Sequence, residues 1–173
     1  MLKWLSYFWR LSILKASPDH APAAKSVLHL TVFVYWGLAA LFASFSQSLF
    51  ESFFLALVQT AILMFFTNLS LWIRQYPERA SQTLTAVFGA GSIILLASIF
   101  LSSNISISIG QSPNILFSLL LVFLVWTVIV YANIFKVSLS IPYFAGLGIA
   151  LIFVYLSFSI TWRFLKIISI SQI

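Results

Sequence analysis

Long runs of apolar residues alternate with short polar segments along this chain. A helix needs roughly 20 apolar residues to cross a hydrocarbon layer about 30 Å thick, because each residue advances the helix by about 1.5 Å. Five runs have this length, so the sequence predicts an all-α integral membrane protein with a single membrane domain, residues 1–173. We expect the five transmembrane helices at about residues 27–46, 52–73, 77–103, 113–135 and 142–164.

Residues at the predicted helix starts support these boundaries. Ser48 and Glu51 have the spacing of a capping box, in which each side chain accepts a hydrogen bond from the backbone amide of the other residue. Pro77, Pro113 and Pro142 stand in predicted first turns, where a missing amide hydrogen costs little. The links between helices are therefore short, and no segment is long enough for a soluble domain.

The first 16 residues are apolar but carry three cations. At helical spacing they form an amphipathic helix, which we expect to lie in the membrane interface. Its polar stripe contains Lys3, Ser6 and Arg10, and its apolar side contains Trp4, Phe8 and Leu11. The alternative is a short sixth span, which would have to carry Arg10 through the hydrocarbon. The segment SPDHAP then ends this helix.

Composition agrees with the pattern of apolar runs. Hydrophobic residues make up 62% of the chain and charged residues 7%, with a mean hydropathy of +1.09. The net charge of +6 does not predict nucleic-acid binding, because the cations stand at the ends of apolar segments rather than in one patch. The first strong apolar run begins at Val27 and is too long for a signal-peptide core, so we expect it to be retained.

The distribution of cations predicts the orientation of the helices. Lysines and arginines are more frequent on the cytoplasmic side of membrane proteins. Placing the N-terminus in the cytoplasm and the C-terminus outside gives seven cations inside and two outside. The inner set is Lys3, Arg10, Lys15, Lys25, Arg74, Arg79 and Lys136, and the outer set is Arg163 and Lys166.

Few residues in this chain could carry out acid-base or metal chemistry. The chain has no cysteine, and its carboxylates and histidines are Asp19, Glu51, Glu78, His20 and His29. Their spacing gives no carboxylate pair, no metal-ligand set and no phosphate-binding loop. We therefore expect a protein that is not an enzyme, with no catalytic, metal-binding or cofactor-binding residues.

The neutral polar residues within the predicted spans include Gln59, Asn68, Thr127 and Asn133, together with Thr60, Thr83 and Thr85. An amide without a partner in hydrocarbon costs several kcal/mol, so Gln59 is expected to face other helices and to hold them together. An alternative is that Gln59, Thr127 and Asn133 line a path for a neutral solute in an oligomeric channel or facilitator.

The link between the second and third predicted helices is the most polar feature of the chain. It provides a candidate contact for a protein partner or for lipid headgroups, formed by Arg74, Gln75, Glu78, Arg79 and Gln82. The alternative is an ordinary solvated loop in which Glu78 makes a local ion pair.

Small residues mark positions where transmembrane helices can approach closely. They occur as Ala86, Gly89 and Ala90 in the third predicted helix and as Gly146 and Ala150 in the fifth. We expect these two helices to pack tightly, either against each other or across a homo-oligomer.

Two segments carry a resemblance to a known family. PERASQTLTAVFGAG, residues 77–91, and KVSLSIPYFAGLGIAL, residues 136–151, together with the order of spans resemble small bacterial inner-membrane proteins of Yip1-like type. The resemblance implies five spans, a cytosolic N-terminus and a role as a trafficking or assembly factor. The eukaryotic Asp-Leu-Tyr-Gly-Pro signature is absent, so binding of small GTPases is not implied.

These observations predict a non-enzymatic multi-pass protein of the bacterial inner membrane. Its expected role is that of a scaffold or accessory factor for a membrane assembly, with the lipid bilayer and a protein partner or second copy as its contacts. The alternative is the channel or facilitator subunit described above.

Overall fold

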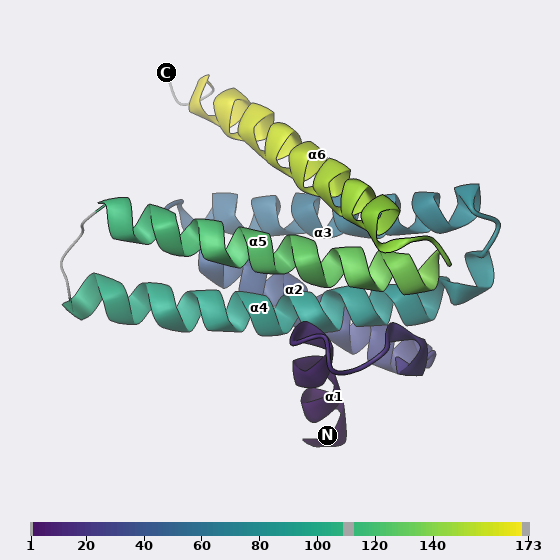
Figure 1. Ribbon diagram of the computed structural model, residues 1–173. Helices are drawn as coiled ribbons and strands as arrows, with labels where there is room; N and C mark the ends of the chain where they lie inside the picture. The colour runs from purple at the N-terminus through teal and green to yellow at the C-terminus, as the bar shows by residue number, and fades with distance from the viewer. Residues whose placement is uncertain (1, 109–112, 171–173) are drawn as a thin grey trace.

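The computed structural model describes residues 2–108 and 113–170, and these are almost entirely helical (Figure 1). Five helices are long and apolar enough to cross a membrane, so the predicted class, a multi-pass helical membrane protein with a short N-terminal helix, is confirmed. The elements are α1 (Leu2–Ser12), η1 (Pro18–His20), α2 (Lys25–Ala43), α3 (Leu49–Ile73), η2 (Pro77–Arg79), α4 (Ala80–Ser108), α5 (Pro113–Ser138) and α6 (Tyr143–Ile170).

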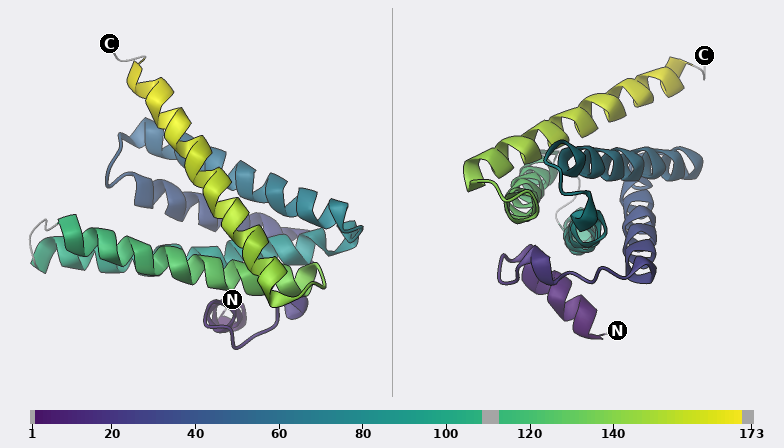
Figure 2. Two further views of the ribbon diagram at one scale, coloured as in Figure 1. Left: turned by 45° about the horizontal axis from the view of Figure 1, so that its top comes forward. Right: turned by 90° about the vertical axis from the view of Figure 1, so that its right-hand side faces the viewer.

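The long helices alternate in direction, so α2, α4 and α6 start at the same end of the molecule, where α3 and α5 finish (Figure 1). We call this the link end, because it holds the link between α3 and α4. Helices α4 and α5 run side by side, α2 packs against both α3 and α4, and α1 lies across α4 (Figure 2). Helix α6 crosses the other helices obliquely and diverges from them toward its C-terminus.

Helix α4 is the centre of the fold. Every residue from Thr83 to Ile94 is buried, because α1, α2 and α5 surround this part of the helix. A side chain at Gly89 would overlap the ring of Phe8, and one at Gly91 would meet the ring of Tyr35 and the hydroxyl group of Tyr131. The small residues of α4 therefore make room for aromatic side chains of its neighbours.

The predicted direct packing of the third and fifth spans within one chain is wrong. Helix α6 packs mainly against α5 and less extensively against α3, and Ala150 is buried in this arrangement. An added Cβ at Gly146 would lie 2.5 Å from the backbone oxygen of Ala132 in α5. The absence of a side chain at Gly146 thus allows α6 to approach α5 closely. Ala86 and Ala90 of α4 are buried among the other neighbours of that helix. Packing of these faces across a homo-oligomer stays a prediction.

The helix ends have clear local causes. The predicted capping box is present, with the Ser48 amide donating to Glu51 Oε2 at 3.1 Å and the Glu51 amide donating to Ser48 Oγ at 3.5 Å. The C-terminal ends of α1, α3 and α5 are each followed by a residue of positive φ, namely Leu14, Gln75 and Ser140. The next amide in each case bonds back to the helix, as from Tyr76 to the Leu71 carbonyl at 2.9 Å, which is a Schellman arrangement.

Candidate functional site

The polar link between α3 and α4 is attached to the end of α5. Arg79 Nη1 donates to the Ser138 carbonyl oxygen at 3.3 Å and to Ser140 Oγ at 3.1 Å. Arg74 Nη2 donates to the Leu139 carbonyl oxygen at 3.5 Å. The last carbonyls of a helix lack partners within the helix and carry partial negative charge, so two guanidinium groups suit this position. The arginines therefore stabilise the junction of α5 with α6.

Tyr76 completes this arrangement, because the Arg79 guanidinium carbon lies 4.7 Å from the centre of its ring. The other predicted contact residues differ in exposure. Gln75 and Glu78 are exposed and Gln82 is half-buried. Within the described part of the chain Glu78 makes no ion pair, so the predicted local pairing of this carboxylate is not seen. Gln75 and Glu78 are thus available to another molecule, whereas the arginines already have contacts.

Trp72 extends the exposed surface of the link end, and the sequence interpretation missed it. It is 71% exposed and lines two shallow hollows. One of about 310 Å³ also contains Asn68 and Pro77, and the other of about 560 Å³ contains Gln75 and Pro77. A tryptophan at the end of a span is typical of the membrane interface, and that signal was present in the sequence.

The neutral polar residues of the spans do not gather in one place. Gln59 Nε2 donates to Thr161 Oγ1 of α6 at 3.4 Å, so this amide faces a neighbouring helix as its cost in hydrocarbon requires. Thr127 donates to the Phe123 carbonyl and Asn68 to the Met64 carbonyl of their own helices, each at 2.8 Å.

Gln59 also lines a cavity of about 200 Å³ among α2, α3, α4 and α6. Neither Thr127 nor the half-buried Asn133 is among the residues that line this cavity. The three side chains proposed for a solute path are therefore not joined by it, and the facilitator stays a prediction from the sequence.

The N-terminal segment is fixed to the bundle by side chains that the sequence did not single out. Trp126 Nε1 of α5 donates to the Ser12 carbonyl at 2.8 Å, and Ser12 Oγ lies 3.5 Å from the Ala90 carbonyl of α4. Tyr7 donates to the Ser17 carbonyl at 2.8 Å. Burial, and secondarily the charge of Asp19, raise the pKa of Tyr7 to about 12. The segment is thus part of the packed structure.

Among the described residues, no group of three or more histidine, cysteine, aspartate or glutamate side chains could hold a metal ion. Comparisons with protein families, with curated proteins and with solved structures give no match to this chain. The fold and these contacts define a multi-pass helical membrane protein in which arginine contacts join two of the helix ends.

Proposed function

We propose that this protein is a non-enzymatic scaffold or accessory factor that binds a partner within a membrane assembly or trafficking process. The observation that carries the proposal is the poor packing of α6. Buried residues make up 17% of its most apolar segment, against 28% for α2 and for α3, 33% for α5 and 67% for the span that contains α4. Helix α6 therefore leaves most of its surface outside the bundle, with large exposed side chains such as Tyr155, Phe158 and Trp162.

Contact with lipid alone does not explain what holds α6 in its position. Acyl chains are as apolar as the side chains they would touch, so helices associate in a membrane through close packing and hydrogen bonds. Helix α6 has such packing around Gly146, and further along it has the Gln59–Thr161 hydrogen bond and the stacked rings of Phe54 and Phe164. A helix of a partner, packed against the outer side of α6, would supply the close packing that this side lacks within the chain.

The link end offers a polar contact beside the same helix. Helix α6 begins just after the turn at Ser140, which Arg79 contacts. The exposed side chains of Gln75 and Glu78 therefore lie in the part of the molecule where α6 starts. A partner with a membrane helix and a polar segment at the interface would use both surfaces.

The proposal includes the cytoplasmic position of the link end and a bacterial inner membrane as the host. Lys25, Arg74, Arg79 and Lys136 belong to helix ends at the link end, against Arg163 and Lys166 near the other end of α6, and this excess of cations supports the orientation. The resemblance to Yip1-like proteins supports the membrane and the type of role. Labelling of single cysteines placed at Arg79 and Lys136 tests the orientation, because the chain has no cysteine of its own. Labelling of both positions from the outer side of the membrane would overturn the orientation, and opposite accessibility of the two would overturn the threading of the spans.

The partner is tested by photo-crosslinking from single positions in the native membrane. A crosslinking residue replaces Glu78 at the link end or Tyr155 on α6, and the control replaces Phe33, which is 65% exposed on α2. We expect the same partner from the first two positions and none from Phe33. The same partner should co-purify after mild detergent extraction. Isolation of a lone monomer without crosslinks from either test position would refute the proposal.

A further inference from the structure

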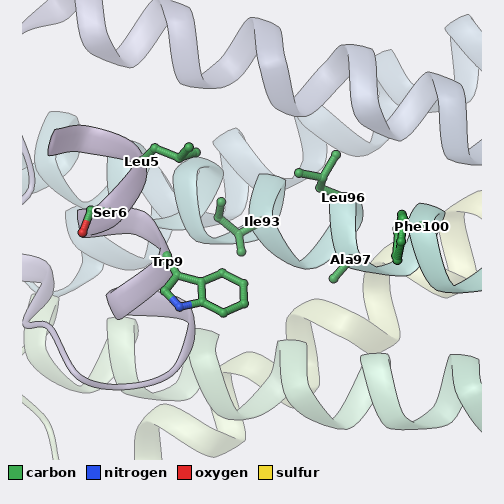
Figure 3. Close-up of a pocket in the computed structure, with 7 residues that line it drawn as sticks. All are labelled: Leu5, Ser6, Trp9, Ile93, Leu96, Ala97 and Phe100. Carbon is green, nitrogen blue, oxygen red and sulfur yellow. The ribbon is translucent and has the colours of Figure 1, made fainter. Parts of the chain in front are cut away.

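Two hollows of the structure differ in the chemistry of their linings. The groove between α1 and α4, of about 670 Å³, is hydrophobic apart from Ser6 (Figure 3). It lies beside the middle of the span that contains α4, where acyl chains of the bilayer would fill it. The cavity beside Gln59 is smaller but combines hydrophobic walls with polar side chains, so it can discriminate between molecules.

The cavity beside Gln59 begins at the end of the molecule opposite the link end. Its lining includes Gln47 and the exposed Ser46, which belong to the turn between α2 and α3. Gln59 lies 11 residues after the cap residue Ser48, or roughly 16 Å along α3 at about 1.5 Å per residue. The cavity therefore extends from the membrane surface to about the middle of the hydrocarbon.

The deepest polar group of the cavity has hydrogen-bonding capacity left over. A glutamine side chain has two N–H donors and an acceptor oxygen. Over residues 2–108 and 113–170 the Gln59 side chain makes one hydrogen bond, from Nε2 to Thr161 Oγ1 at a long 3.4 Å. Its Oε1 and its second N–H have no protein partner there. Polar groups at this depth need a partner, so the cavity beside them should supply one.

The lining also indicates which molecules the cavity would reject. Its described residues include no aspartate, glutamate, lysine, arginine or histidine, so an ion would lose its hydration without gaining a counter-charge. An acyl chain would leave the Gln59 amide without a partner. At about 200 Å³ the cavity has room for several water molecules or for one small solute.

Packed side chains close the cavity on the side of the link end. One turn beyond Gln59, Leu63 of α3 is completely buried. Tyr35 of α2 packs its ring edge-on against Phe88 of α4, with centroids 5.1 Å apart. This closed shape suits a binding site better than a path across the membrane.

We propose that the cavity binds a small uncharged solute of the amide or alcohol class, which enters from water at the end opposite the link end. The solute would accept a hydrogen bond from the free N–H of Gln59 and donate one to Oε1. Its carbon skeleton would contact the walls formed by Ala39, Leu55 and Ala56. The site depends neither on the partner nor on the orientation proposed above.

The test measures the reactivity of single cysteines, because the chain has none of its own. A thiol reacts with N-ethylmaleimide as the thiolate, which forms in water and is disfavoured in hydrocarbon. Ala56→Cys places a thiol on the wall of the cavity, and the control Leu57→Cys places one at the same depth on an exposed side of α3. In phospholipid vesicles we expect the thiol of Ala56→Cys to react at least about tenfold faster.

Acetamide and acetate then probe the class of ligand, because they have nearly the same shape and differ in charge. Acetamide at molar concentration should slow the reaction of Ala56→Cys roughly threefold relative to a free thiol in the same solution, which is the factor at twice the Kd. Acetate should not slow it. Gln59→Met keeps the length of the side chain without the amide and should abolish the protection.

Ala43→Cys on the α2 wall, with the exposed Leu41→Cys as its control, repeats the measurements if Ala56→Cys does not fold. Circular dichroism checks the folding of each variant. Equal reactivity of the cavity cysteine and its control would overturn the site, because the cavity would then hold no water. No protection by acetamide, or equal protection by acetate, would also overturn it. So would protection that survives in Gln59→Met.

Discussion

A single methyl group placed at Gly146 should weaken the contact between α5 and α6. The added Cβ would lie 2.5 Å from the Ala132 carbonyl oxygen and 3.1 Å from the Lys136 amide nitrogen. Both are backbone atoms within a helix, so neither can rotate away. Ordinary contact begins near 3.4 Å, and α6 would have to withdraw by roughly 0.9 Å to reach it. A gap of that size forfeits about a quarter to a half of the dispersion energy between the facing atoms.

Gly148 provides a matched control on the same helix, because a Cβ there would meet nothing within 4 Å. Both Gly→Ala changes add the same methyl group to α6, so the gain in helix propensity, about 1 kcal/mol, cancels between them. We expect Gly146→Ala to have a free energy of unfolding about 1–3 kcal/mol below that of Gly148→Ala, which is the usual cost of overpacking. Substitution by valine should widen the difference.

The assay is reversible unfolding by dodecyl sulfate in mixed micelles, followed by far-ultraviolet circular dichroism. Equal stability of the two alanine variants would refute the reasoning, because the close approach of α6 to α5 would then not limit side-chain size. Higher stability of Gly146→Ala would refute it more strongly.

Three further predictions concern the helix ends and the N-terminal segment. Gln75→Gly should raise the free energy of unfolding by about 1 kcal/mol in the same assay, because glycine adopts the observed φ of 61° without strain; a loss of stability would contradict this. Arg79→Gln should lower it by about 1–2 kcal/mol through loss of the contacts with the end of α5, whereas Glu78→Gln should change it by less than about 0.5 kcal/mol; equal effects would contradict the assignment. Burial raises the pKa of Tyr7 from 10.0 to about 12. Between these pH values the hydroxyl group keeps its proton in the docked segment but would lose it in a released segment. Its contribution to docking is complete below pH 10 and is lost as the pH rises through 12. Ultraviolet titration of the native protein against Tyr7→Phe should give a midpoint near 12, and a midpoint near 10 would show that the tyrosine is not buried.

The sequence predicted the features that depend on neighbouring residues. Five apolar runs of suitable length gave the five spans, and the spacing of Ser48 and Glu51 gave the capping box. The alternation of polar and apolar positions also placed Lys3 and Arg10 on the polar side of α1, where they are exposed, and Phe8 and Leu11 on its apolar side, where they are buried. Trp4 was expected on the same apolar side but is 45% exposed. These properties follow from helical geometry alone.

The choice of partners between helices could not be read in this way. Small residues in α4 and α6 indicated close packing, but any neighbouring helix can fill such a space. Gly89 receives Phe8 and Gly146 receives the backbone at Ala132, so the two helices use their small residues on different neighbours. Likewise, the sequence identified Arg79 in the link without showing that the end of α5 lies beside it.

The attachment of α1 has a consequence for the biogenesis of the protein. The bond from Trp126 to the Ser12 carbonyl joins positions 114 residues apart, and Ala90, the other neighbour of Ser12, is 78 residues away. At about 5–20 residues per second, a ribosome needs roughly 6–23 s to synthesise the longer interval. During that time the start of the chain waits for its binding surface, while its tryptophans and cations favour adsorption to the bilayer surface. The N-terminal segment is therefore made well before its binding surface and is among the last parts of the structure to reach its final position.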